Sequence, residues 1–473
     1  MRMDFSPITR RQTLRSLFLG SSLFPALLSE LLAKDAAPGS ENPLAPKAPH
    51  FPGTAKRVIF IYLSGGMSHI DSFDPKTKPA ADGENGRKFL PSQWASKPRG
   101  KSGIEVTDLF PHTADAVDDL CIIRSMHGDH NDHFQATLGI HTGSVTFQRP
   151  SLGSWVTFGL GTENQNLPCY VVLAPLMPYC GSQVWSSDFL PGVYSGTRIT
   201  SGPEPIPDLN RRAPSAELQK LELSLLDKFN RKHAREHPGD PMLEARIKSY
   251  ETAFGMQMTM PQVLDLRKET DATLKLYGME RGNTTGFGWQ CIVARRMIEQ
   301  GVRFVELIDT GSSKNWDAHS DVHSHEPLAR KIDQPIAGLL ADLKSRGLLK
   351  DTLVVFTTEF GRTPRAEGAL GRGHFNKAYS SWLAGGGIKG GTVYGKTDDL
   401  GANIVENGCH VHDFHATILH CLGFDHTKLT FRHGGRDYRL TDVAGNVVNE
   451  ICSTVEERVQ GDPRGPGGPP LVT

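Results

Sequence analysis

The feature that most constrains the fold is a set of four short apolar runs, each followed by side chains that can bind metals or anions. The runs are RVIFIYL at 57–63, LCIIR at 120–124, VRFVELI at 302–308 and LVVF at 353–356. Their length and their β-branched residues predict buried strands. The polar loops that follow them cover residues 64–74, 127–133, 309–319 and 359–374. Because parallel strands bring their carboxyl ends to one edge of a sheet, these loops are expected to converge on one site.

Helical periodicity separates some of these runs. One helical face carries Ile332, Ile336, Leu339, Leu340 and Leu343, and Gly347 ends that helix. The order strand, helix, strand from 302 to 356 predicts a parallel pair with a right-handed crossover. Residues 209–281 alternate charged side chains with leucines at helical spacing, which predicts two to four inserted helices. The chain is therefore expected to be an α/β protein with a mostly parallel central sheet flanked by helices, and with a helical insertion.

This domain is expected to span residues 56–452, after a linker at 38–55 and before a disordered Pro/Gly-rich tail at 461–473. Within it, residues 169–174 and 381–384 predict further strands. A helix is predicted over residues 414–422 with Asp413 as its N-cap. The seven cysteines form no C-x-x-C motif, which argues against a zinc knuckle, but Cys169 and Cys180 can pair in an oxidising compartment.

Charge and histidine content narrow the classes of function. Lys+Arg and Asp+Glu are both 52 in a chain of 473 residues, and a neutral chain is not expected to bind nucleic acid non-specifically. The 19 histidines gather in clusters, several of them in the loops after the predicted strands. Neutral imidazole is a good ligand for transition metal ions, so the clusters indicate a metal site.

The first 37 residues resemble a twin-arginine export signal. Arg10 and Arg11 precede a mostly apolar run from Leu17 to Leu32. Pro25 and Glu30 interrupt that run, so no stable membrane span is expected. We therefore expect export by the twin-arginine route to the periplasm or the cell exterior.

Three of the four loops carry the clearest candidate ligands. Three histidines, two aspartates and an asparagine lie within residues 127–133, a composition that core packing does not explain. Asp317 and His319 are two residues apart, so in an extended segment they share one face and can bind one ion. Glu359 and Arg362 follow the last run and suit a metal and an anion. The alternative interpretation is a surface loop held by a Glu–Arg ion pair.

Several motifs, in the same order along the chain, resemble the family of unknown function numbered 1501. They are SGGMSHIDSFDPK at 64–76, HFQATLGIHTGS at 133–144, ARRMIEQGVRFVEL at 294–307 followed by WDAH, TTEFGRTP at 357–364 and AGGGIKGGTVYGKTD at 384–398. The resemblance covers residues 55 to 450 approximately. It implies a fold similar to the alkaline phosphatase and sulfatase superfamily, whose enzymes use one or two metal ions to hydrolyse phosphate or sulfate esters.

The resemblance also implies a set of metal ligands. Asp317 and His319 resemble the superfamily's Asp/His pair after a central strand, and His374 resembles its last metal histidine. Glu359 stands where the superfamily has the Asp of an Asp-His pair, with Phe360 in place of the His.

Two positions depart from the expected pattern. Ser64 stands where the superfamily usually has a metal-binding Asp, so His69 and Asp71 are expected to take over as ligands. Gly371-Arg372-Gly373-His374 stands where the family usually has GRDH, so a carboxylate that would support a ligand is lost.

The expected nucleophile position holds no Ser, Thr or Cys, and no C/S-x-P-x-R motif occurs. We therefore predict attack by a metal-bound water. The predicted catalytic residues are His133, His130, Asn131 and Arg362, and the predicted substrate-binding residues are Arg362, Arg372 and Ser64. Zinc is the expected ion, with manganese, iron and calcium as alternatives.

These features together predict an exported metal-dependent hydrolase of phosphate or sulfate esters, acting on an anionic ester or polysaccharide. The alternative is a non-catalytic secreted protein of the same fold that binds an anionic glycan or a protein partner. The dense ligand-type loops favour the enzyme, and the missing hydroxyl or thiol nucleophile favours the alternative.

Replacement of Arg10 and Arg11 by Lys should leave the protein in the cytoplasm, because the twin-arginine translocase reads that pair. The measurement is cell fractionation with immunodetection of the wild type and the double variant. Unchanged export of the variant would reject the signal assignment.

Overall fold

A computed structural model describes residues 42–77, 88–207, 209, 213–237 and 241–453. The expected export signal at 1–37 and the expected tail at 461–473 lie outside the described residues, as does the beginning of the expected linker. No helix within the described ranges is both long enough and apolar enough to span a bilayer.

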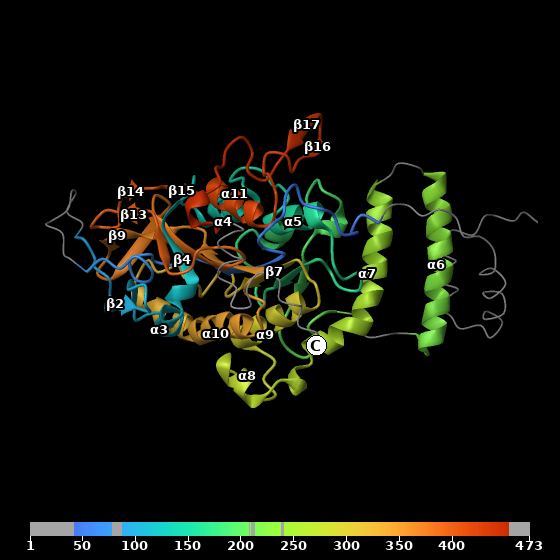
Figure 1. The fold of residues 1–473 in the computed structure, drawn as a ribbon, viewed down its shortest axis with the longest axis horizontal. Helices are drawn as coiled ribbons and strands as arrows, with labels where there is room; N and C mark the ends of the chain where they lie inside the picture. Colours follow the sequence, from blue (N-terminus) through green and yellow to red (C-terminus); the bar gives the residue numbers. More distant parts are fainter. Residues whose placement is uncertain (1–41, 78–87, 208, 210–212, 238–240, 454–473) are drawn as a thin grey trace, which may run out of the picture.

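A nine-stranded mixed sheet forms the centre of the molecule (Figure 1). In spatial order its strands are β12 (Thr392–Tyr394), β4 (Leu120–His127), β11 (Tyr379–Gly385), β8 (Thr352–Thr358), β1 (Arg57–Leu63), β7 (Phe304–Ile308), β5 (Tyr170–Leu173) and β6 (Thr197–Ile199), with β15 (Cys409–His410) also paired to β4. β11 is antiparallel to both of its neighbours, and the other pairs are parallel. The predicted fold class, an α/β protein with a mostly parallel sheet, is confirmed.

The two strands of the predicted strand–helix–strand unit, β7 and β8, are parallel but are not neighbours. β1 lies between them, with Val58 opposite Phe304 on one side and Leu353 on the other. From Val58 to Leu63 the run is buried and has no charged residue of the kind that protects an edge strand. Such a strand suits the centre of the sheet, where neighbouring strands pair with both of its edges.

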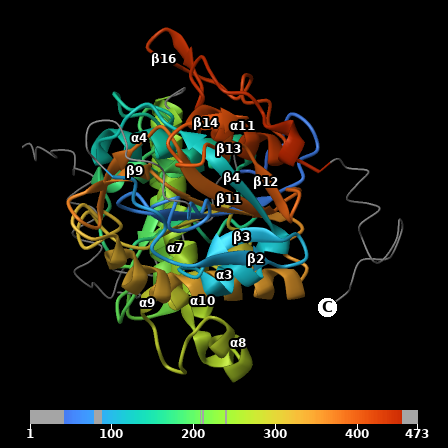
Figure 2. The ribbon, with the colours of Figure 1, turned by 90° about the vertical axis from the view of Figure 1, so that its left-hand side faces the viewer.

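Both faces of the sheet are covered, which explains why β1 is buried from Val58 to Leu63. Ile59, Ile61 and Leu63 pack with α9 (Gly286–Glu299) and α10 (His325–Ser345) on one face. Val58, Phe60 and Tyr62 pack with α5 (Leu152–Leu160) and α11 (Val411–Cys421) on the other. Figure 2 shows α9 and α10 below the sheet and α11 above it. Alternate side chains of the strand therefore belong to two separate cores.

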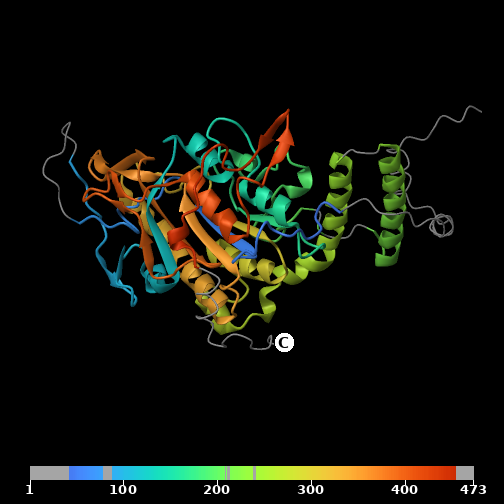
Figure 3. The ribbon, with the colours of Figure 1, turned by 45° about the horizontal axis from the view of Figure 1, so that its top comes forward.

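The region 209–281 contains three helices: α6 (Ala216–Glu236), α7 (Pro241–Leu264) and α8 (Asp271–Leu276). α6 and α7 lie side by side at one end of the molecule (Figures 1 and 3), far from the edge of the sheet that carries the candidate ligands. The remaining elements are α3 (Pro111–Asp115), α4 (His133–Thr142) and the hairpins β2/β3 (Ser96–Arg99, Ile104–Thr107), β9/β10 (Gly361–Glu367, Gly371–Phe375), β13/β14 (Lys396–Thr397, Ile404–Glu406) and β16/β17 (Phe431–His433, Arg436–Tyr438).

One local prediction was wrong, and one pairing that the sequence allowed does not form. The N-cap of α11 is His410, and Asp413 is the third helical residue, whose carboxylate accepts the backbone N–H of His410 (2.9 Å) in a capping box. Cys169 and Cys180 are not paired, and all seven cysteines are free thiols. Cys180 instead donates its S–H to the backbone carbonyl of Phe134 (3.0 Å).

Candidate metal centre

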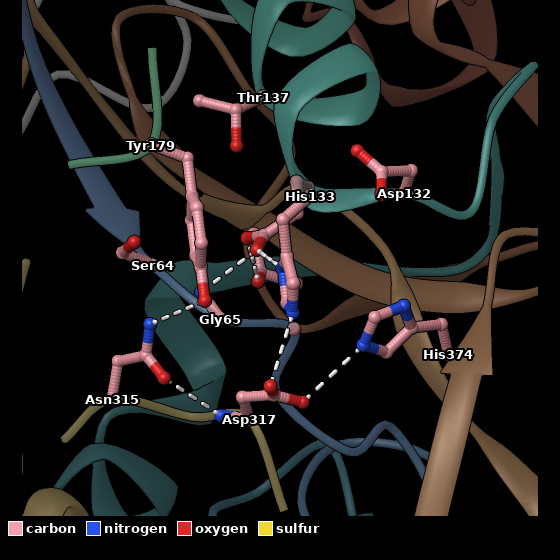
Figure 4. Close-up of polar contacts among 12 residues, drawn as sticks. Ser64, Gly65, Asp132, His133, Thr137, Tyr179, Asn315, Asp317 and His374 are labelled. Atoms are coloured by element: carbon pink, nitrogen blue, oxygen red, sulfur yellow. Dashed lines mark hydrogen bonds and ion pairs between the residues drawn. The ribbon is translucent and has the colours of Figure 1, made fainter. Parts of the chain in front are cut away.

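His133, Asp317 and His374 point toward one another at the carboxyl edge of the sheet (Figure 4). Each offers a ligand atom, and these three atoms all lie within 4.8 Å of one another. His133 Nε2 is 3.4 Å from Asp317 Oδ2, and His374 Nε2 is 3.3 Å from Asp317 Oδ1. His319 adds a further nitrogen, because its Nε2 lies 2.9 Å from His374 Nε2 and 3.0 Å from Asp317 Oδ1.

Three different elements deliver these side chains. His133 is the first residue of α4, where Asp132 caps the helix by accepting the backbone N–H of Phe134 (2.9 Å). Asp317 lies in the loop after β7, and its backbone N–H donates to Asn315 Oδ1 (3.2 Å). His374 lies on β10, and the β9/β10 hairpin places it opposite Arg362. The convergence of the loops after β4, β7 and β8 is the arrangement expected from a parallel sheet.

Each imidazole has an acceptor at Nδ1, which fixes the tautomer in the same way for all three rings. His133 Nδ1 donates to Glu359 Oε1 (2.8 Å), and His319 Nδ1 donates to Glu367 Oε2 (2.8 Å). His374 Nδ1 donates to the backbone carbonyl of Asn131 (2.7 Å). A ring that donates from Nδ1 presents the lone pair of Nε2 to the cluster, as metal-binding histidines do.

The donor set fits a divalent transition metal. The imidazole nitrogens of His133 and His374 and the carboxylate of Asp317 are ligands that zinc and its neighbours bind. Zinc–nitrogen bonds of about 2.0–2.1 Å in a tetrahedron place the ligand atoms roughly 3.3 Å apart, close to the observed separations at Asp317. His133 Nε2 is also buried, and it faces Asp317 Oδ2 at 3.4 Å as an ion pair without the geometry of a hydrogen bond, so a bound ion would give this nitrogen a direct contact.

Charge around His133 decides its protonation. Burial by itself lowers the pKa of His133, but the hydrogen bonds and charges of Asp317 and Glu359 outweigh burial and raise that pKa to about 9. For Asp317, burial raises the pKa, but the hydrogen bonds of His133 and His374 and the charge of Arg362 lower it well below the usual range. Without metal, the His133 imidazolium therefore bridges two carboxylates, and metal binding must displace the proton on Nε2.

Glu359 lies behind His133 and does not belong to the ligand cluster. Its Oε1 accepts the Gly65 backbone N–H (2.8 Å) as well as His133 Nδ1, and its Oε2 accepts the Tyr62 hydroxyl (2.9 Å) and the Thr358 hydroxyl (3.0 Å). The sequence placed Glu359 among the metal ligands, but this fully occupied carboxylate orients His133 instead.

Arg362 is fully buried and binds protein groups. Its Nη2 lies 2.8 Å from Asp317 Oδ1 and also donates to the carbonyl of Gly65, and its Nε donates to the carbonyl of Gly66 (2.7 Å). Gly66 has φ +79°, and a Cβ there would lie 2.5 Å from the ring of Phe360, so only glycine suits the position. The predicted role in substrate binding gives way to one in holding Asp317 and the loop after β1.

His69, Asp71 and Arg372 do not reach the cluster. Asp71 and Arg372 are fully buried and form an ion pair (2.7 Å), and Arg372 also donates to the carbonyl of Leu90 (2.9 Å). His69 is fully buried with Nε2 at 3.0 Å from the carbonyl of Gly401. A buried carboxylate needs a cationic partner, and Arg372 supplies it. The structure therefore places the predicted ligands His69 and Asp71, and the predicted substrate residue Arg372, in the scaffold.

The other predicted residues surround the cluster. Ser64 is fully buried at the end of β1, and its backbone N–H donates to Asp309 Oδ1 (3.2 Å). Nδ1 of His130 accepts a hydrogen bond from the backbone N–H of Asp132 (3.1 Å). The backbone carbonyl of Asn131 accepts a hydrogen bond from His374 Nδ1.

Two residues that support the histidines of the cluster could not be recognised from the sequence. Tyr179, from the loop after β5, stacks on His133 with ring centroids 4.3 Å apart and planes 3° from parallel (Figure 4). Its hydroxyl accepts from Asn315 Nδ2 (3.2 Å). Glu367 supports His319 from the far end of β9. Neither Tyr179 nor Glu367 comes directly after a predicted strand, as Glu359 does. Only folding brings these two residues next to the histidines.

Comparison with known proteins gives one family match. The sequence matches the family described as "Protein of unknown function (DUF1501)" over residues 55–452. A search of curated proteins finds no match.

Three solved structures illustrate the likeness at the level of coordinates. A lipoteichoic acid synthase from Listeria monocytogenes has a TM-score of 0.36 at 8% identity, covering 85% of this chain and 78% of its own. A sulfatase from Pseudoalteromonas sp. has a TM-score of 0.33 at 11% identity, with 78% and 68% covered. An alkaline phosphatase from the Antarctic bacterium TAB5 has a TM-score of 0.30 at 10% identity, with 70% and 92% covered. Likenesses this weak say nothing of the chemistry of this chain, which must be inferred from its own side chains.

Glu359→Gln should weaken metal binding by about 10- to 100-fold, because it removes the charge that holds His133. Since the pKa of His133 is raised to about 9, metal binding at pH 7 should release a proton from this ring, and affinity should rise with pH until about pH 9. Calorimetric titration with Zn²⁺, in buffers of different ionisation enthalpy, measures both quantities.

The matched control is Glu406→Gln on the exposed strand β14, which should change neither quantity. Wild-type affinity and proton release in Glu359→Gln would contradict this account of His133.

Proposed function

Since the chain belongs to the family DUF1501, whose description names no activity, we propose a function from the site itself: metal-dependent hydrolysis of phosphate or sulfate esters. The observation that carries the proposal is the convergence of His133, Asp317 and His374, with His319 beside them at the solvent side. The proposed substrates are anionic esters, including those on polysaccharides, and the proposed ion is zinc.

His133, Asp317 and His374 would hold the ion. Catalytic zinc sites have three protein ligands and keep one position for water or substrate, whereas structural sites are closed by four. A divalent cation held there would act as a Lewis acid on the ester and lower the pKa of a water molecule.

His319 would take the proton from the attacking water at Nε2. Its side chain is 42% exposed, compared with 11% for His133 and 20% for His374, so it is the histidine of the cluster that solvent and substrate reach most easily. Glu367 accepts from Nδ1 and would stabilise the imidazolium that forms. A base oriented by a carboxylate is the usual arrangement for general base catalysis.

In the proposed reaction the water oxygen bonds to phosphorus or sulfur, and the bond to the ester oxygen breaks. The proton that His319 accepts can then go to the leaving alcohol, so atoms and charge balance. Tyr179 shields one face of His133 from water, and Arg362 fixes the orientation of Asp317. We place this chemistry outside the cytoplasm, on the basis of the twin-arginine segment at Arg10–Arg11.

His319→Ala tests the division of roles. If His319 is the base, kcat on 4-nitrophenyl phosphate or 4-nitrophenyl sulfate should fall about 10²- to 10⁴-fold, while zinc affinity changes little. His323→Ala is the control, because His323 is an exposed histidine of the same loop region that pairs with Asp321.

Two results would contradict the proposal. A wild type that is fully loaded with metal but hydrolyses neither ester, together with a His319→Ala variant that loses the metal, would indicate a closed four-ligand site and the non-catalytic binding protein. A phosphate or sulfate ester trapped on Ser or Thr after an acid quench would replace direct water attack by a covalent mechanism.

A further inference from the structure

A pocket of about 510 Å³ opens directly beside the candidate metal centre. It lies between residues 312–317 and the first turns of α10, and its wall includes Asp317 and Tyr179. These two residues also contact His133, so the pocket is continuous with the cluster. Its volume is within the range of about 300–1,000 Å³ that is usual for small-molecule sites.

The lining of this pocket mixes polar and apolar surface, and its charged side chains are two lysines and Asp317, whose carboxylate pairs with Arg362. Lys314 comes from the loop and Lys331 from α10, and neither forms an ion pair with any residue that the structure describes. Hydroxyl and amide groups stand around them, from Ser312, Ser313, Asn315 and Ser324.

The backbone holds Lys314 in an uncommon conformation. Its φ is +52°, in the left-handed region that a lysine rarely adopts. Non-glycine residues kept in this region concentrate at ligand-binding segments, where the surrounding contacts hold the strain. Asn315 donates to Tyr179 Oη and to the carbonyl of Gly311 (3.0 Å), which anchors the loop next to Lys314.

We propose that this pocket binds a second anionic group of the substrate, and that Lys314 and Lys331 determine that specificity. The inference rests on the proposed hydrolase function and narrows its substrate class to sugar esters with at least one further phosphate, sulfate or carboxylate group. The hydroxyl and amide lining suits the sugar hydroxyls, and Pro327 and Leu328 supply a small apolar wall.

The charges explain why the second group must be an anion. The two ammonium groups stand on the two segments that enclose the pocket, and an anion bound between them is attracted by both. Lys314 and Lys331 are both exposed, so this attraction is screened by salt. Binding of a doubly charged substrate should therefore weaken with ionic strength more than binding of a singly charged one.

The test compares esters that differ only in the second group. The probes are glucose 1,6-bisphosphate against glucose 6-phosphate, and disulfated against monosulfated galactose. The measured quantity is the ratio of kcat/KM for the doubly charged ester to that for the singly charged ester. The wild type should prefer the doubly charged ester of its own ester class by about tenfold or more at low salt, and raised salt should reduce this preference.

Lys314→Ala combined with Lys331→Ala should lower that ratio at least tenfold and remove most of its salt dependence. Lys428→Ala, an exposed lysine outside the pocket, should leave the ratio as in the wild type. A double variant with the wild-type ratio overturns the pocket assignment and leaves the hydrolase proposal intact.

A second arm separates failure of the pocket from failure of the hydrolase. Calorimetric binding of glucose 1,6-bisphosphate and disulfated galactose to the zinc-loaded proteins needs no turnover. If no ester is hydrolysed, the proposed function fails, and the pocket is judged by this arm alone. A dissociation constant that is at least tenfold higher in the double variant supports the pocket assignment, and an unchanged constant overturns it.

Discussion

The site depends on one buried carboxylate, that of Glu359 at the end of β8. A charge in the core is tolerated only when hydrogen bonds and an opposite charge compensate for lost hydration. Glu359 obtains four hydrogen bonds, from Gly65, Tyr62, Thr358 and His133, and so joins the ends of two central strands to the start of α4. The Glu359 contact fixes the position of His133, and Asp317 and Glu359 together raise the pKa of its imidazole. The other ligands are arranged around His133.

A second buried charge extends the same scaffold to Asp317. Arg362 spans from the carbonyls of Gly65 and Gly66 to Asp317 Oδ1, which ties the loop after β7 to the loop after β1. Buried groups thus fix the inner side of the cluster, whereas His319, Glu367, Lys314 and Lys331 stand at its exposed side. This division agrees with a rigid support for the ion and a reactive, substrate-facing surface.

The strands and the edge of the sheet that carries the site could be predicted from the sequence, because apolar runs and the polar residues after them are local patterns. Asp317 and His319 were predicted as ligands from this pattern, and His374 from the family resemblance. The exact role of a residue depends on partners far along the chain: Arg372 meets Asp71 in the core, and Glu359 is surrounded by donors from β1 and α4. A local pattern does not show which groups a side chain meets in the folded chain. Glu359, His69 and Asp71 were therefore predicted as metal ligands, although each contacts other protein groups. The position of β1 between β7 and β8 was missed for a similar reason, since sequence order does not fix spatial order in a sheet.

The central claim is that this fold holds a divalent ion between His133, Asp317 and His374. Elemental analysis of the protein, purified without chelators, tests it most directly. The account predicts about one transition metal ion per chain in the wild type, and its loss in the variant that combines His133→Ala with Asp317→Ala. A metal-free wild type that also fails to bind added zinc, or a double variant with the same metal content as the wild type, would contradict it.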